Sequence, residues 1–193
     1  MGRRRVQGTK RRHLAGRGQE SAVIHSEPHT EPVIVQVSEA RTAVVRGQDV
    51  AFADLTSFYD AAFAALSEVL AERNLTPVGP AFGLMTRPPT ETMDLEVGFA
   101  IDHPLEGSHT AGSGVVVEPS ILPEGTTAAA SHLGAYDALG DAWDAFIAWI
   151  EEQGYSPQLP FWEVYVTEPS PDADPASMRT DLFVPVAKNA GVA

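Results

Sequence analysis

The sequence predicts an α+β fold made of tandem duplicated β-α-β-β modules, related by pseudo-twofold symmetry, with a central ligand groove between them. The first observation is that strand and helix patterns follow one another in the same order twice. The second is that residues 74–77 align with residues 154–157. Residues 94–97 likewise align with 179–182, at a similar offset. A sequence period of this kind indicates one structural unit used twice.

The elements of the first half follow from apolar spacing and from Pro and Gly punctuation. Residues 33–45 alternate as a strand, bent near 38–39. Residues 54–73 have apolar side chains at three- and four-residue steps, which predicts a helix. Strands are then predicted over 79–86 and 92–101, on either side of a proline-rich turn.

The second half repeats this order after a loop over 103–114 and a short apolar run. A strand of small residues is predicted over 127–133, and an amphipathic helix over 136–153 that Gly154 ends. Two strands complete the module. Their predicted bounds are 161–167 and 178–186.

The basic residues are concentrated at the N-terminus. Seven of the 13 lie in the first 17 positions, which contain no acidic residue. We therefore expect residues 1–31 to be a disordered basic tail, able to contact phosphates, or an extension from a start codon assigned too far upstream. The expected folded domain covers 32–187, with repeats at about 32–102 and 113–187, and residues 188–193 form a second tail.

The composition narrows the partners of the folded body. Beyond the first 17 residues the chain has six basic and 26 acidic residues, so it should favour cationic partners and repel nucleic acid. Cysteine is absent, and neither an apolar run of membrane-spanning length nor a signal peptide is visible, which favours a cytoplasmic protein without membrane contact. The six histidines lack the spacing of a metal site, and no motif for a cofactor is present.

The strand predicted over 161–167 carries the main candidate for function. Alternation puts Trp162 and Val164 on one face, and Glu163 and Tyr165 on the other. A carboxylate between aromatic side chains suits a lipophilic cation, because charge pairing is combined with cation–π contact. The alternative is a structural ion pair between Glu163 and a cation such as Arg179 on the neighbouring strand.

Further residues are candidates for the same groove. Alternation suggests Phe82 and Leu84 in the first half, with Met85 nearby if the register shifts by one residue. Tyr59, near the start of the first helix, is a pocket candidate. Tyr136 is either a groove wall or a hydrophobic staple on the second helix. Trp143 lies on the apolar stripe of that helix and is a candidate for both core and groove.

Several short segments, taken in their order, resemble a known family. They are Asp-Leu-Glu-Val-Gly-Phe at 94–99, Leu-Gly-Ala-Tyr at 133–136, Ala-Trp at 142–143, Gly-Tyr at 154–155, Trp-Glu-Val-Tyr-Val-Thr at 162–167, and Arg-Thr-Asp-Leu at 179–182. With these segments, residues of about 32–187 resemble the GyrI-like small-molecule-binding family, also called the AraC effector-binding domain. The chain departs from that pattern at Ala135, where the family usually has proline.

The resemblance implies tandem modules of the SHS2 type around a groove for hydrophobic, often cationic, small molecules. It also implies that Glu163 is the ligand-facing carboxylate and that Tyr136 lines the groove. Family members occur as effector sensors fused to DNA-binding domains in transcription regulators, and as standalone proteins. Residues 1–31 are too short and polar for such a DNA-binding domain, so we expect a standalone member that senses or sequesters its ligands.

Two other functions remain open. Some standalone relatives are described as hydrolases of reactive toxins, and here Glu163 would be the general base, with Tyr165 or Tyr136 as a hydrogen-bond donor. That reaction needs a second polar group, which Glu96 or Asp181 would supply if either faces the groove. The founding type of the family inhibits gyrase, so the acidic body could instead bind a protein partner by resembling DNA.

Overall fold

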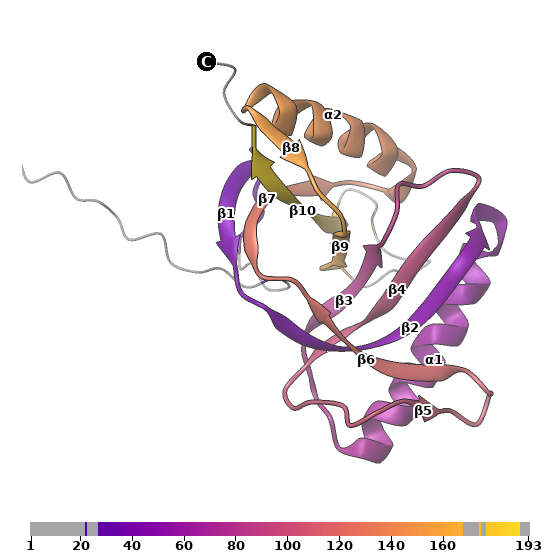
Figure 1. The fold of residues 1–193 in the computed structure, drawn as a ribbon. Helices are drawn as coiled ribbons and strands as arrows, with labels where there is room; N and C mark the ends of the chain where they lie inside the picture. Colours follow the sequence, from indigo (N-terminus) through magenta and orange to yellow (C-terminus); the bar gives the residue numbers. More distant parts are fainter. Residues whose placement is uncertain (1–21, 23–26, 168–173, 175–176, 190–193) are drawn as a thin grey trace, which may run out of the picture.

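The computed structural model describes residues 22, 27–167, 174 and 177–189, and these form a mixed α+β fold (Figure 1). The first half of the chain contributes β1 (Val33–Val37), β2 (Ala40–Ala51), the 3-10 turn η1 (Phe52–Asp54), α1 (Leu55–Arg73), β3 (Pro77–Met85), β4 (Thr92–Ile101) and β5 (His109–Thr110). The second half contributes β6 (Val116–Leu122), β7 (Gly125–Leu133), the 3-10 turn η2 (Tyr136–Ala138), α2 (Leu139–Glu152), β8 (Tyr155–Pro157), β9 (Phe161–Tyr165) and β10 (Arg179–Lys188).

The strands form one large antiparallel sheet in the order β1-β7-β10-β9-β3-β4-β2-β6-β5, with β8 paired to β10. Its centre is the pair β3–β9, where Gly83 lies opposite Glu163. Counted outward from this pair, β4 and β2 follow on one side and β10 and β7 on the other. The α+β class is confirmed. The duplication of the module stays a prediction, although this strand order is the one that two modules would give.

The sheet is curled so strongly that its two ends lie side by side. Residues 38–39 connect β1, at one end of the strand order, to β2 near the other, and residues 123–124 connect β6 to β7 in the same way. With two connecting residues the flanking Cα atoms can be at most about 11 Å apart, so the ends of the sheet must be neighbours. The predicted single bent strand over 33–45 is therefore wrong: β1 pairs with β7, whereas β2 pairs with β4 and β6.

The inside of this curl is a hydrophobic core. Trp162 and Phe183 are fully buried there and stack with ring centroids 5.3 Å apart. The indole Nε1 of Trp162 donates a hydrogen bond of 3.0 Å to the carbonyl of Ala22, which is itself buried. The polar edge of the largest core side chain is thus satisfied by a residue far away in the sequence.

The two helices cover separate parts of the outer face of the sheet (Figure 1). Helix α1 packs Leu66 and Val69 against Leu95 and Val97 of β4. Helix α2 packs Phe146 and Ile150 against small and apolar residues of β7 and β10. Both helices match their predicted positions, because each has an apolar stripe at helical spacing.

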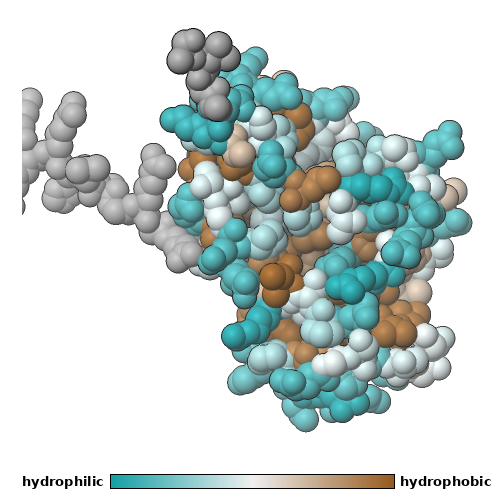
Figure 2. Space-filling view, viewed as in Figure 1, coloured by the Kyte–Doolittle hydropathy of each residue, from teal (hydrophilic) through white to brown (hydrophobic). Residues whose placement is uncertain are grey.

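Polar residues make up most of the face of the molecule that Figure 2 shows. On the face seen in Figure 2, hydrophobic residues reach the surface as separate patches. None of the helices in the described ranges is long and apolar enough to cross a membrane.

The ends of the chain differ in part from expectation. Most of the predicted tail 1–31, and most of the segment between the last two predicted strands, lie outside the described residues. Within the tail, the backbone of His29 hydrogen-bonds to Ser131 in both directions, so this part lies against β7. Strand β9 ends at Tyr165, two residues earlier than predicted, and β10 continues to Lys188.

Candidate functional site

Glu163 lies in the middle of β9 on the outer face of the sheet, where it is partly buried. Its Oε1 accepts a 2.7 Å hydrogen bond from the indole Nε1 of Trp143 on α2. Its Oε2 accepts a 3.0 Å hydrogen bond from the hydroxyl of Tyr165. Both carboxylate oxygens are therefore held by neutral donors, and the orientation of the carboxylate is fixed.

The first half of the chain reaches this carboxylate through Tyr59 of α1. The hydroxyl oxygens of Tyr59 and Tyr165 are 2.7 Å apart. Since the hydroxyl hydrogen of Tyr165 is directed to Glu163, Tyr59 is the donor in this pair. A chain of hydrogen bonds thus runs from α1, over the β3–β9 pair, to the carboxylate.

Aromatic rings surround the carboxylate from several elements. The ring centroid of Tyr165 lies 6.0 Å from that of Tyr59 and 6.2 Å from that of Tyr136, with near-perpendicular planes. The ring of Trp143 lies 5.0 Å from that of Phe161. The structure therefore brings together five of the predicted site residues: Tyr59, Tyr136, Trp143, Glu163 and Tyr165.

Burial decides the acid–base properties of this cluster. It raises the pKa of Glu163, while the hydrogen bonds from Trp143 and Tyr165 and the nearby imidazole of His132 oppose that rise. Burial likewise raises the pKa of Tyr59 and that of Tyr165, so both hydroxyls stay protonated donors. The carboxylate is the group that changes charge, and a bound cation would favour its ionised form.

The alternative ion pair between Glu163 and Arg179 is not formed. Arg179 pairs with Asp181 through two hydrogen bonds of 2.8 Å and also donates to the carbonyl of Glu27. Within the described ranges, no Lys or Arg forms an ion pair with Glu163. The carboxylate of Glu163 accepts hydrogen bonds, but its negative charge is not neutralised by a Lys or Arg of the described ranges.

The predicted positions of Phe82 and Leu84 beside Glu163 are wrong. Both are buried in the core inside the curl, because they pair with Val164 and Trp162, which point inward. The alternation in β3 therefore gives the outer face to Gly83 and Met85 instead. Met85 pairs with Phe161 and is on the side of Glu163, as the one-residue shift predicts, but it is almost fully buried.

Glu96 and Asp181 also lie on the inner face, away from Glu163. Glu96 is bound by Arg46 and Ser120, at 2.8 and 2.7 Å. Asp181 is opposite Val164 in the register and is held by Arg179. Neither carboxylate supplies the second polar group that a hydrolytic site around Glu163 requires.

Three residues of this site were missed in the sequence. Gly83 lies opposite Glu163, and its missing side chain leaves room for the hydroxyls of Tyr59 and Tyr165. A glycine inside a strand often marks a position where another group approaches the backbone closely, and this was the signal in the sequence that could have identified Gly83. His132 of β7 lies near enough to affect Glu163, and Thr180 of β10 lies near enough to affect the hydroxyl of Tyr136. No local pattern marks these two, because only the strand register brings them there.

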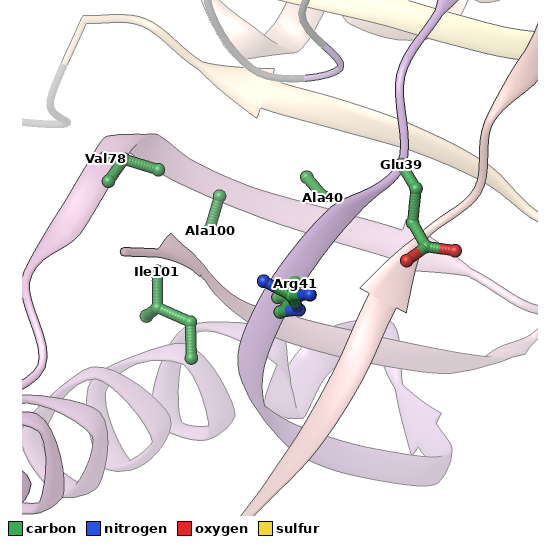
Figure 3. A pocket seen from close by; sticks show the side chains of 6 residues that line it. All are labelled: Glu39, Ala40, Arg41, Val78, Ala100 and Ile101. Atoms are coloured by element: carbon green, nitrogen blue, oxygen red, sulfur yellow. The ribbon is translucent and has the colours of Figure 1, made fainter. Parts of the chain in front are cut away.

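Two surface depressions lie elsewhere on the molecule. The larger has a volume of about 360 Å³ and is lined by Glu39, Ala40, Arg41, Val78, Ala100 and Ile101, at the start of β2 and the irregular part of β3 (Figure 3). The smaller, of about 150 Å³, is lined by Arg73, Leu75, Pro104, Leu105, Glu106 and His109. Neither includes Glu163. No group of three or more metal-ligating side chains occurs among the residues that the structure covers.

Comparisons with known proteins agree with this fold. Residues 30–187 match the profile of the GyrI-like small molecule binding domain. A search of curated proteins found no match. Among solved structures, the C-terminal domain of EcmrR is similar with a TM-score of 0.68 and 21% identity, over 82% of this chain and 98% of that domain.

Two further structures extend the comparison. EcmrR in its complex with DNA has a TM-score of 0.68 and 22% identity over 82% of this chain, which spans only 57% of that protein. SAV2435 bound to tetraphenylphosphonium has a TM-score of 0.57 and 14% identity, over 81% of this chain and 94% of that one. At these identities the likeness shows a shared fold.

Proposed function

The chain belongs to the GyrI-like small molecule binding domain family, and we propose that it binds hydrophobic cationic molecules at Glu163, as a sensor or sequestering protein. The observation that carries this proposal is the partly buried Glu163 carboxylate, oriented by Trp143 and Tyr165 without a paired Lys or Arg in the described ranges. A lipophilic cation would supply the missing charge.

The aromatic surroundings support the same class of ligand. The rings of Tyr59, Tyr136 and Tyr165 lie around the carboxylate, and each cation–π contact contributes about 0.5–2 kcal/mol. That a protein of the same fold is known bound to tetraphenylphosphonium makes this cation the natural first probe. Contacts with aromatic rings are less directional than hydrogen bonds, so the site would accept cations of several shapes. We therefore expect the protein to bind several drugs rather than a single ligand.

The setting of the protein is proposed from sequence features. The absence of cysteine fits a cytoplasmic protein. The likeness to the C-terminal domain of EcmrR, a protein whose structure is known in complex with DNA, fits a role in transcription regulation together with a DNA-binding partner. We favour the small-molecule role because the exposed acidic residues of the described part of the chain are distributed over several loops and both helices.

The test is a titration with tetraphenylphosphonium, followed by tryptophan fluorescence and calorimetry. Glu163→Gln keeps the size of the side chain but removes its charge, and should weaken binding at least about tenfold, or ~1.4 kcal/mol. Glu124→Gln removes an exposed charge elsewhere and should bind as the wild type does. Equal binding by all three proteins, or none by the wild type, would contradict the proposal.

The same mixtures test the hydrolase alternative by mass spectrometry with reactive electrophilic compounds. Consumption of a compound with gain of one water, lost in Glu163→Gln, would identify an enzyme. We expect every compound to be recovered intact, since Glu96 and Asp181 face away from Glu163.

A further inference from the structure

Gly83 is placed where a side chain would disturb the hydrogen bonds to Glu163. It is buried in β3, directly opposite Glu163 in the strand register. A Cβ at this position would lie 2.5 Å from the hydroxyl oxygen of Tyr165 and 2.8 Å from that of Tyr59. The backbone of Gly83 is not in the left-handed region, so the need for glycine comes from these two hydroxyls alone.

The two hydroxyls connect the halves of the molecule. Tyr59 and Tyr165 are separated by 106 residues in the sequence, yet their hydroxyl oxygens meet at 2.7 Å over Gly83. The donor order, from Tyr59 to Tyr165 to Glu163, stabilises a negative charge on the carboxylate because each hydrogen bond polarises the next. Helix α1 of the first half thus acts on a charge in the second.

We propose that Gly83 is a positioning residue for the Glu163 site: its missing side chain seats the hydroxyls of Tyr59 and Tyr165, and through them helix α1 stabilises the ionised carboxylate that receives the cation. Only one part of this inference rests on the proposed function, namely that the ligand of the carboxylate is a cation. The effect of Gly83 on the carboxylate can be measured without any ligand.

The other groups that face Glu163 do not replace this effect. Among the described residues, Tyr136 of η2 and His132 of β7 are the remaining titratable side chains that act on it, and α2 supplies the neutral indole of Trp143. On β10, Arg179 and Asp181 bind each other on the opposite face. When Tyr165 is displaced, burial acts with less opposition, so the pKa of Glu163 rises further and cation binding needs a higher pH.

The experiment is a set of variants in which the pKa of Glu163 is measured by NMR of ¹³C-labelled glutamate carboxyls without ligand. The resonance is assigned from its absence in Glu163→Gln. Gly83→Ala should raise the pKa of Glu163 and move the pH midpoint of tetraphenylphosphonium binding upward, with severalfold weaker binding below that midpoint. Gly140→Ala is the control, because a Cβ there meets nothing within 4 Å.

A variant that lacks both hydroxyls shows whether Gly83→Ala changes the pKa of Glu163 through them. In Tyr59→Phe/Tyr165→Phe both clashing oxygens are gone, so adding Gly83→Ala should leave the pKa of Glu163 unchanged. If Gly83→Ala alone fails to fold, Tyr59→Phe provides the measurement instead, since it removes the first donor and keeps the ring. It should also raise the pKa of Glu163.

The outcomes separate this inference from the proposed function. An unchanged pKa of Glu163 in folded Gly83→Ala or Tyr59→Phe overturns the inference, as does an equal effect of Gly83→Ala in the background without the hydroxyls. A wild type that binds no tetraphenylphosphonium overturns the proposed function, and the NMR titration still decides the role of Gly83.

Discussion

At the scale of single residues, Glu163 shows which part of a site's position follows from the strand pattern and which part follows from the packing of the fold. The alternation in 161–165 puts Glu163 and Tyr165 on one face, and the structure agrees. The same reasoning was wrong in β3. There the large apolar residues, Phe82 and Leu84, fill the core, and the face of Glu163 receives Gly83. Alternation defines two sets of side chains, but only packing decides which set points inward.

The charge of Glu163 should reduce stability as the pH rises. Burial raises its pKa in the folded state above the unfolded value, so the folded protein holds this proton over a pH window where the unfolded chain has lost it. Stability therefore falls as the pH rises from the unfolded pKa through the folded one. We expect Glu163→Gln to gain stability relative to the wild type across this window.

Urea unfolding between pH 4 and pH 8 measures this difference. Glu124→Gln, at an exposed position, is the control and should follow the wild type at every pH. A constant offset between Glu163→Gln and wild type over the whole range would contradict the prediction.

The hydrogen bond from Trp143 should be measurable against the other tryptophan of the same helix. Trp143→Phe removes the donor to Glu163, and the loss of a hydrogen bond to a charged group costs about 1.5–3 kcal/mol. Trp149 is also partly buried on α2. If the indole bond matters, Trp143→Phe will lower both the free energy of unfolding and the affinity for tetraphenylphosphonium, whereas Trp149→Phe will leave the affinity unchanged. Equal affinities of the two variants would argue against it.

At the scale of elements, helices were easier to predict than strands. Predicted bounds of 54–73 and 136–153 lie close to α1 and to η2 with α2, because helical periodicity is a local property of the sequence. The division between β1 and β2 was missed. Their pairing with distant strands is set by the curl of the whole sheet, which no local pattern records.

The curl of the sheet can be tested at the last two residues of β6, which precede the connection 123–124 to β7. Leu122 is fully buried inside it, while its neighbour Ile121 is 50% exposed. Leu122→Ala should lower the free energy of unfolding by about 2–5 kcal/mol, since it leaves a cavity in the core. Ile121→Ala should change it by less than about 0.5 kcal/mol. If chemical denaturation gave similar losses in the free energy of unfolding for both variants, the end of β6 would not be packed as described.

At the scale of the whole molecule, the acidic body should attract cations before they reach the site. The chain has a net charge of −13, and beyond the basic first 17 residues the acidic excess is larger. Such a field raises the local concentration of cations, and salt screens it with a Debye length of about 10 Å at 0.1 M and about 3 Å at 1 M.

Binding of tetraphenylphosphonium should therefore weaken severalfold between low salt and 1 M NaCl. Neutral triphenylphosphine oxide is the matched ligand, and any binding of it should not weaken with salt. Calorimetry at three salt concentrations makes the comparison. A cation affinity that is independent of salt would show that only short-range contacts matter.

The site is assembled across the β3–β9 seam from parts that are far apart in the sequence. Tyr59 and Gly83 come from the first half, and Tyr136, Trp143 and Glu163 from the second. Natural selection can therefore alter one wall while the carboxylate and the opposite wall stay intact. A family built this way can diversify its ligands by exchanging or mutating half of the chain at a time, with the fold kept as a constant frame.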